Sequence, residues 1–248
     1  MQTQNFKLII AYNGKYFKGV VPQPNSITIG QQLKECFYKL GWKKVSLHFC
    51  ARTDAGVHAQ ENWVQVHVKE WVGEVCVDLM NLILPAHLKV KSIFEDQHFQ
   101  AIGPKTTKKY QYKLSMNVKD IGCDDTLYWD EDLNFSKMKQ ACESFQGNHD
   151  FFFFQKGESQ NARNQSRRNI IEASLKYLGG DQAILMEVTC NGFLRHMVRY
   201  MMGALINIGK GTYSLSDLEH SLEKSGKGTV GFLVPPEGLT LQKIELGP

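Results

Sequence analysis

Apolar residues alternate with polar ones in some stretches of this 248-residue chain and recur every three or four positions in others. Alternation is typical of a half-buried strand, and the wider spacing is typical of an amphipathic helix. The first half predicts strands at 6–12, 45–51, 62–68 and 89–94 and helices at 29–40 and 74–84. The second half predicts strands at 106–116, 168–177, 183–189 and 239–246 and helices at 134–145, 193–208 and 216–224.

The two halves follow a similar plan of strands interleaved with helices. This order predicts an α+β protein made of two similar α/β subdomains, with largely antiparallel mixed sheets and helices packed on one side. We expect residues 1–103 to form the N-terminal subdomain and residues 104–248 the C-terminal one. No glycine-rich fingerprint opens a helix after a strand, so no dinucleotide cofactor is expected.

The composition is that of an ordinary globular protein, with 42% hydrophobic and 22% charged residues. No apolar run approaches the ~20 residues that cross a bilayer, so no membrane association is expected. The first five residues hold neither a basic patch nor an apolar core, which excludes a secretion signal there. We therefore expect a cytoplasmic protein.

Charge is distributed unevenly along the chain, whose net charge is +4. Basic residues cluster at 105–109, 163–168 and 195–199, whereas acidic residues cluster at 124–125 and 130–132. Segregation by sign favours one basic face that binds a polyanion such as a nucleic acid.

The cysteine spacing argues against a metal centre. The six cysteines stand at positions 36, 50, 76, 123, 142 and 190 and form no C-x-x-C pair. A zinc site is therefore not expected, and the thiols are interpreted as reduced and mostly buried.

The stretch with the most chemical character is Ala51–Ala59, which lies between two predicted strands. It carries Arg52, Asp54 and His58 around a glycine. An isolated Asp-x-Gly is typical of a plain turn. Two strands that hold a short charged loop are also a rigid way to present one carboxylate.

The loop resembles the signature loop of the TruA family of tRNA pseudouridine synthases, which reads Arg-Thr-Asp-x-Gly-Val-His-Ala. Further family-like segments follow in the correct order at 108–112 (basic-x-Tyr-x-Tyr), 192–199 (Gly-Phe-Leu-x-His-Met-Val-Arg) and 234–241 (Val-Pro-Pro-x-Gly-Leu-x-Leu). The resemblance covers nearly the full chain. It implies the pseudouridine synthase fold, with an active-site cleft between the two subdomains.

The resemblance also implies three catalytic residues. Asp54 corresponds to the essential aspartate and is expected to be the nucleophile. Arg199 corresponds to the arginine that forms an ion pair with that aspartate, which would keep it ionised and fix its direction. Tyr110 corresponds to the tyrosine over the target base, where a phenol stacks on uracil or moves a proton.

Further residues are expected to bind the substrate. Four positions between Arg195 and Arg199 would place both on one face of the predicted 193–208 helix. The expected substrate-binding residues are Arg52, Thr53, His58, Tyr110, Arg168, Arg195 and Leu239. The chain departs from the family at Val20-Val21-Pro22-Gln23, where Trp-Gln is usual, and at Phe99-Gln100-Ala101-Ile102, where the family has Phe-His-Ala-Arg.

The implied activity is isomerisation of uridine to pseudouridine at positions 38–40 of the tRNA anticodon stem-loop, by a homodimer. The reaction involves no redox change or phosphate transfer, so no cofactor and no metal are expected. Asp54 would either attack ribose C1′ or remove a sugar proton to give a glycal, and the sequence leaves both open.

Three other readings remain open from the residues alone. A non-catalytic RNA-binding module would explain the basic clusters but not the intact loop. A metal-assisted hydrolase would use Asp54, His58 and His149, although a loop spacing of four is weak ligand spacing. A cysteine nucleophile would need a polar, basic setting that no cysteine has in the sequence.

Overall fold

The computed structural model describes residues 3–69, 76–102, 106–156, 165–180, 182–223 and 228–247. The chain divides into two compact units, which are residues 1–105 with 241–246, and residues 106–240. Some positions in the predicted features lie outside the described residues, namely Glu74, Lys105, Arg163, Asp181 and Lys224.

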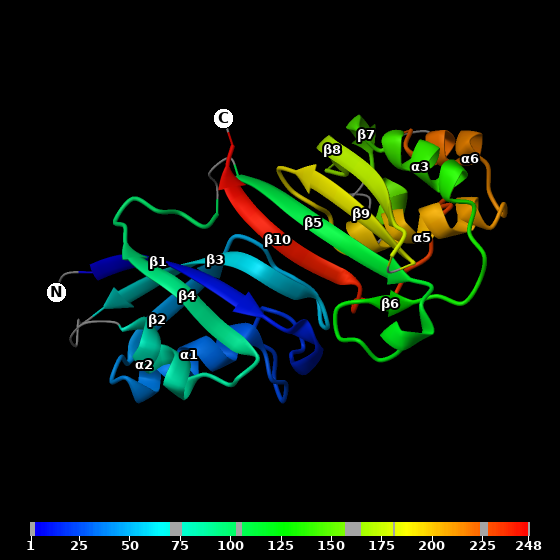
Figure 1. The fold of residues 1–248 in the computed structure, drawn as a ribbon. Helices are drawn as coiled ribbons and strands as arrows, with labels where there is room; N and C mark the ends of the chain where they lie inside the picture. Colours follow the sequence, from blue (N-terminus) through cyan, green and yellow to red (C-terminus); the bar gives the residue numbers. More distant parts are fainter. Residues whose placement is uncertain are drawn as a thin grey trace. The chain divides into compact units, whose positions relative to one another are not determined.

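The first half of the chain contributes four antiparallel strands to the first unit. These strands are β1 (Thr3–Tyr12), β2 (Lys44–Phe49), β3 (His58–Lys69) and β4 (Leu88–Glu95), paired in the order β4-β1-β3-β2. Its helices α1 (Ile29–Lys39) and α2 (Val77–Ile83) lie on one face of these strands (Figure 1). The strands and helices predicted for this region are confirmed, except that β3 begins at His58, four residues before the predicted start, so His58 and Ala59 belong to the strand and not to the loop.

The core of the first unit forms where the strand and helix periodicities meet. Leu8 and Val64, which face each other across β1 and β3, are 0% exposed, as is Leu33 from α1. Thr28 begins α1, because its side-chain oxygen accepts the Gln31 N–H at 3.3 Å and satisfies one of the free donors of the first turn.

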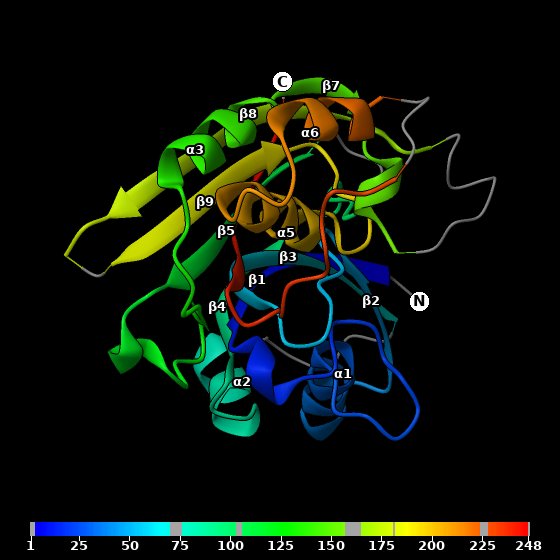
Figure 2. The ribbon, with the colours of Figure 1, turned by 90° about the vertical axis from the view of Figure 1, so that its right-hand side faces the viewer.

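The second unit repeats this architecture. Its strands are β5 (Thr106–Ser115), β6 (Leu127–Tyr128), β7 (Gly147–Asp150), β8 (Arg167–Leu178) and β9 (Ala183–Cys190). The order β5-β9-β8-β7 is antiparallel, and β6 pairs parallel with β5. The helices α3 (Phe135–Glu143), α5 (Met197–Gly209) and α6 (Leu215–Ser221) lie on one side of β8 and β9 (Figure 2).

The prediction of an α+β protein with mostly antiparallel strands is therefore confirmed. The last strand, β10 (Leu239–Leu246), also occurs where the sequence predicts it. Its first two residues belong to the second unit, and its residues from Leu241 belong to the first.

The local predictions differ from the structure in two places. The expected strands omit β7, which pairs with β8 from Gly147 to Asp150. The helix predicted over 193–208 begins only at Met197, because His196 has a left-handed backbone with φ of 67°. Arg195 thus precedes the helix and shares no helical face with Arg199.

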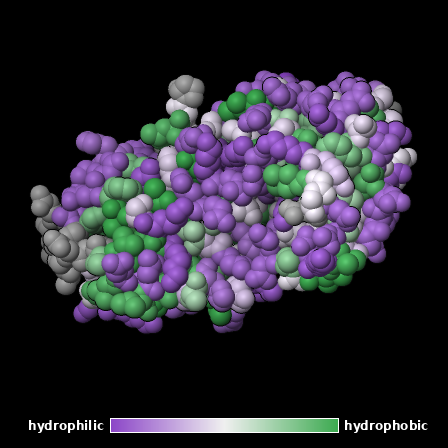
Figure 3. All heavy atoms as spheres, viewed as in Figure 1, coloured by the Kyte–Doolittle hydropathy of each residue, from purple (hydrophilic) through white to green (hydrophobic). Residues whose placement is uncertain are grey.

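The surface in Figure 3 is largely hydrophilic, with an apolar area over α2 at the lower left. Leu79 and Leu82 of α2 are 45% and 82% exposed. Among the described helices, none combines the length and the apolar character that crossing a membrane requires.

Candidate active site

The stretch Ala51–Ala59 contains the loop between β2 and β3 and the first two residues of β3, and it has both buried and accessible side chains. Thr53, Val57 and His58 are buried, whereas Arg52 is exposed and Asp54 is partly exposed. Gly56 has φ of 82°, and the Val57 N–H donates to the Asp54 carbonyl at 3.3 Å. The predicted turn therefore exists, and it brings the arginine and the carboxylate to the surface of a fixed loop.

Neutral buried side chains hold the start of this loop. The Tyr12 hydroxyl lies 2.8 Å from the Thr53 hydroxyl. The Asn62 amide accepts from the Ala51 N–H at 3.3 Å and donates to the Ala51 carbonyl at 2.8 Å and to the Tyr12 hydroxyl at 3.2 Å. Burial raises the pKa of Tyr12 to about 12, so its hydroxyl stays protonated at physiological pH.

The segment 13–20 lies along the loop and fixes its other side. The Gly14 N–H donates to His58 Nδ1 at 3.2 Å, the Gly56 N–H donates to the Phe17 carbonyl at 3.3 Å, and the Val20 N–H donates to the Thr53 carbonyl at 3.3 Å. A Cβ on Gly14 would lie 2.1 Å from the Val57 carbonyl oxygen, so only glycine fits there.

His58 therefore has a defined tautomer. A ring nitrogen that accepts a backbone N–H carries no proton, so the neutral ring bears its proton on Nε2. The side chain is only 6% exposed. Its observed role is to join the loop to Gly14, and its contact with substrate stays a prediction.

Tyr110 and Tyr112 share the face of β5 that the alternation predicts. Tyr110 is 8% exposed, and its ring meets Phe193 edge-on, with centroids 5.1 Å apart and an interplanar angle of 83°. Tyr112 is fully buried and donates to the Pro235 carbonyl at 2.7 Å. Burial raises the pKa of Tyr112, with a smaller contribution from Glu237.

Arg199 on α5 is held by the segment that follows Val230. Its Nε donates to the Val234 carbonyl at 2.7 Å, which fixes the plane of the guanidinium group. Just beyond, Gly238 approaches β5 closely, since its carbonyl accepts the Lys113 N–H at 2.9 Å. Leu239 follows and is 5% exposed. Motif residues that are distant in sequence, from Tyr110 to Leu239, thus belong to one unit.

Arg168 lies on β8, partly buried, and donates through Nη1 to the Gln165 and Arg167 carbonyls at 2.7 Å each. Desolvation by burial lowers its pKa, while nearby Cys190 acts in the opposite direction. Arg195 is exposed. The structure thus places Arg52, Thr53 and Asp54 in the loop before β3 and His58 at the first position of β3, all in the first unit, and the other predicted residues in the second unit.

Two observations on the described residues bear on the metal-assisted hydrolase and the cysteine-nucleophile readings. No group of three His, Cys, Asp or Glu side chains among them is arranged to hold a metal ion. Burial raises the pKa of Cys36 to about 11 and that of Cys142 to about 12, which makes both thiols poor nucleophiles near neutral pH.

Comparison with known proteins agrees with the motifs. A family model described as tRNA pseudouridine synthase matches residues 141–245. The tRNA pseudouridine synthase A of Clostridium kluyveri is 32% identical over 245 residues, which cover 97% of this chain and 99% of that protein. The Staphylococcus epidermidis protein of the same name is 31% identical, with 96% and 90% covered. The chain belongs to the tRNA pseudouridine synthase A family.

A comparison of solved structures gives a more distant match. An H/ACA RNP bound to a substrate RNA containing 2'-deoxyuridine aligns with a TM-score of 0.40 and 13% identity, over 82% of this chain and 44% of that one. This likeness is too low to support a conclusion.

Two residues that hold the 51–59 loop are not among the site residues that the sequence predicts. Tyr12 and Asn62 lie on strands whose patterns predict only packing, yet both hold the 51–59 loop. The available signal was Asn62 itself, which is a polar residue at a fully buried position and is 0% exposed. A buried amide needs partners, and the neighbouring loop supplies them.

Proposed function

We propose that this protein is a tRNA pseudouridine synthase, which isomerises uridine to pseudouridine in tRNA. The observation that carries the proposal is the 51–59 loop, which presents a partly exposed Asp54 from a frame of buried hydrogen bonds. Membership of the tRNA pseudouridine synthase A family over 97% of the chain supports it.

The reaction breaks the bond between ribose C1′ and uracil N1, rotates the base, and forms a new bond between C1′ and C5. The C5–H bond breaks and its proton leaves to solvent, while N1 takes up a proton, so the product is an isomer of the substrate. No electron is gained or lost, so the chemistry needs no external electron carrier, and we assign the group beside the sugar to a carboxylate. Asp54 either attacks C1′ or removes a sugar proton. A rigid loop suits both, because a catalytic group that is fixed in advance needs no reordering during the reaction.

Arg199 is the proposed ion-pair partner of Asp54. A guanidinium carries five N–H donors, and the observed bond from Nε to the Val234 carbonyl uses one of them. This bond also orients the donors on the two terminal nitrogens. An arginine oriented in this way would keep the carboxylate ionised and aim one of its oxygens at the sugar.

Tyr110 is the proposed platform for the target base. The uridine must leave its stack at a cost of a few kcal/mol, and stacking on an aromatic ring offsets that cost. The edge-on contact with Phe193 fixes the Tyr110 ring, which supports this role.

The remaining predicted residues divide by exposure. Arg52 and Arg195 are exposed, which supports their proposed role in contacting RNA phosphates. Thr53, His58 and Leu239 are buried, so they would act on substrate by shaping the loop and the pocket. Arg168 is partly buried and would contact RNA through the edge of its guanidinium group.

We extend the proposal to uridines 38–40 of the anticodon stem-loop, to a homodimer and to a cytoplasmic location. These finer statements rest on the family resemblance alone.

The test is pseudouridine mapping, nucleotide by nucleotide, on unmodified tRNA incubated with the purified protein. The proposal expects new pseudouridine at positions 38, 39 or 40 with the wild type and none with Asp54→Asn. Modification at other tRNA positions would overturn the site assignment. Absence of pseudouridine together with tight tRNA binding would favour the non-catalytic binding module.

A further inference from the structure

An exposed pair of stacked rings lies beside the catalytic loop and has no role in the mechanism above. Tyr16, at the end of the short 3₁₀ helix η1 (Gly14–Tyr16), stacks on His87 with ring centroids 3.4 Å apart and an interplanar angle of 6°. Tyr16 is 45% exposed, and His87 is also exposed. Each ring covers one face of the other, so the exposure that remains belongs to outer faces and edges.

The backbone fixes this pair in place. The Asn13 N–H donates to the His87 carbonyl at 3.0 Å, and Tyr12 faces Leu88 in the pairing of β1 with β4. Two segments that are more than seventy residues apart therefore present their rings from adjoining strand ends. A platform held by main-chain bonds loses little freedom when a ligand stacks on it.

The pair is also tied to the loop that carries Asp54. Gly14, two residues before Tyr16, donates to His58 Nδ1, and Phe17, the next residue, accepts from the Gly56 N–H at 3.3 Å. Phe17 is 4% exposed and packs in the core, whereas its neighbour Tyr16 remains outside. The exposed ring thus lies within two residues of direct contacts with the catalytic loop.

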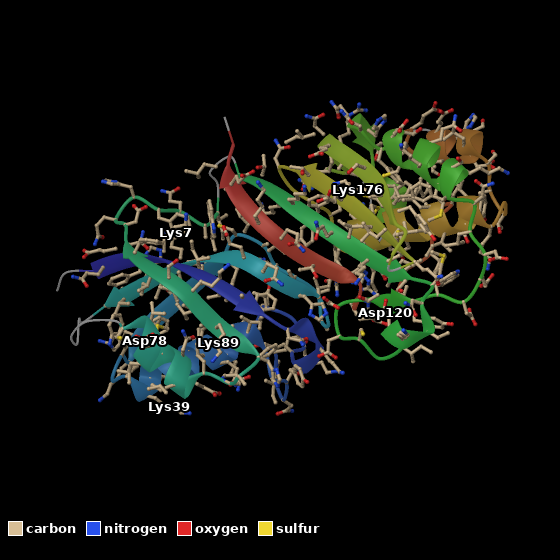
Figure 4. All side chains as sticks on the ribbon, in the orientation of Figure 1. Lys7, Lys39, Asp78, Lys89, Asp120 and Lys176 are labelled. Atoms are coloured by element: carbon tan, nitrogen blue, oxygen red, sulfur yellow. The ribbon has the colours of Figure 1, made fainter. Side chains whose placement is uncertain are left out.

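The charge around the pair suits a polyanion. Lys15, Lys18 and Lys89 are exposed, and Figure 4 labels Lys89 on β4. No acidic residue occurs before Glu35 or between residues 84 and 94. Lysines around an aromatic stack are the combination with which proteins bind single-stranded nucleic acid, because the cations attract phosphates and the rings stack on bases.

We propose that the Tyr16–His87 pair is a stacking platform for an unpaired tRNA nucleobase next to the target uridine. Extrusion of one base exposes the faces of its neighbours, and an aromatic surface beside the catalytic loop replaces the lost stacking partner. The inference rests on the proposed function, and it assigns a base-binding role to Tyr16 and His87.

The experiment measures binding and chemistry separately for wild type, Tyr16→Ala, Tyr16→Phe and Tyr16→Leu. Dissociation constants for a tRNA transcript come from filter binding, and the rate of pseudouridine formation comes from single turnover at saturating enzyme. The matched control is Tyr38→Ala, since Tyr38 is a 51% exposed tyrosine on α1 of the same unit. Thermal unfolding of each variant checks that the fold is kept.

Tyr16→Ala and Tyr16→Leu are expected to weaken binding about 5-fold or more, because base–aromatic stacking contributes on this scale. Tyr16→Phe and Tyr38→Ala are expected to stay within about 2-fold of wild type. Leucine restores apolar bulk but not stacking, so wild-type binding by Tyr16→Leu would overturn the proposal in favour of simple packing. Wild-type binding by Tyr16→Ala would overturn it as well.

A second measurement places the base. Transcripts carrying 2-aminopurine at single anticodon-loop positions report stacking on an aromatic ring as fluorescence quenching. One position is expected to be quenched by wild type and not by Tyr16→Ala, and identical signals at every position would overturn the proposal. Pseudouridine formation by wild type tests the proposed function independently, so the two failures are distinguishable.

Discussion

The loop that carries Asp54 and the 234–236 segment, to which Arg199 bonds, are held by different arrangements of hydrogen bonds. In the first unit, neutral side chains bond to each other and to the loop, through Tyr12, Thr53 and Asn62. In the second unit, Tyr112 and Arg199 each bond to a main-chain carbonyl of the 234–236 segment. In the first unit the hydrogen bonds share side chains and form a connected network. In the second unit the two hydrogen bonds share no side chain, and we call them separate anchors.

The difference has a consequence for tolerance to mutation. Two consecutive prolines, Pro235 and Pro236, stiffen the segment in the second unit, because each ring fixes its own φ. That segment keeps much of its shape when one anchor is lost. The 51–59 loop contains no proline and depends on its buried partners. We therefore expect the loss of one hydrogen-bond partner to be more harmful in the first unit than in the second.

The largest effect on stability is expected from Asn62→Ala. The change leaves the Ala51 N–H and carbonyl and the Tyr12 hydroxyl without their amide partner in a buried site. Unsatisfied buried polar groups cost about 1–3 kcal/mol each, so we expect a loss of about 2–4 kcal/mol in the free energy of unfolding. Urea unfolding measures it, with the exposed Asn148→Ala as control. A loss below about 1 kcal/mol would mean that the network does not hold the loop.

The next effect compares two matched tyrosines. Tyr12→Phe removes one hydroxyl with two partners, Thr53 and Asn62, whereas Tyr112→Phe removes a hydroxyl with one, the Pro235 carbonyl. We expect losses of about 2 and about 1 kcal/mol in unfolding free energy, and a larger fall in pseudouridine formation for Tyr12→Phe. Equal losses, or the reverse order, would remove the distinction between network and anchor.

Much of this arrangement was predictable from local pattern. Alternation placed Tyr110 and Tyr112 on one face, and the flanking strands placed the 51–59 loop. Strand and helix periods report which residues share a face, and a short charged loop between strands follows from chain connectivity alone.

The parts that escaped prediction depend on contacts between distant residues. Phe193 and Leu194 extend the apolar period of α5, yet the left-handed backbone of His196 starts the helix later. The bond from Asn62 to Ala51 and the stack of Tyr16 on His87 have no local signature, because each forms only when the sheet brings two segments together. The pairing of Asp54 with Arg199 stays a prediction.

The third expected effect is a loss of stability at acidic pH. Glu187 on β9 is 4% exposed and is bonded by Gln111 at 2.8 Å, by Lys109 at 2.8 Å and by Lys176, which Figure 4 labels on β8. Burial alone would raise the pKa of Glu187, but these partners outweigh it and lower the pKa to about 2. A lowered folded-state pKa gives stability that is present above the ordinary value of 4.5 and is lost as the pH falls toward 2.

The urea midpoint of wild type is therefore expected to fall between pH 5 and pH 2, and Glu187→Gln is expected to flatten part of that fall. The first unit's loop network is neutral and contributes nothing to it. An unchanged pH profile in Glu187→Gln would contradict the assignment.

The smallest effect compares the caps of one helix in each unit. The side chains of Thr28 and Asn134 accept the N–H groups of Gln31 and Lys137 at the starts of α1 and α3. Replacement of either by alanine is expected to lower the unfolding free energy by about 1 kcal/mol, with no change in the rate of pseudouridine formation. A change in the rate of pseudouridine formation with either variant would contradict this expectation, because it would mean that the start of a helix affects the proposed active site.

The most direct test is the rate of tritium release from tRNA that carries 5-tritiated uridine, measured for wild type and Asp54→Asn together with their unfolding free energies. The account predicts that the asparagine variant loses at least about 10³-fold in rate, while its stability stays within about 0.5 kcal/mol of wild type. Tritium release by Asp54→Asn at a rate near that of wild type would contradict the assignment of the reaction to this carboxylate.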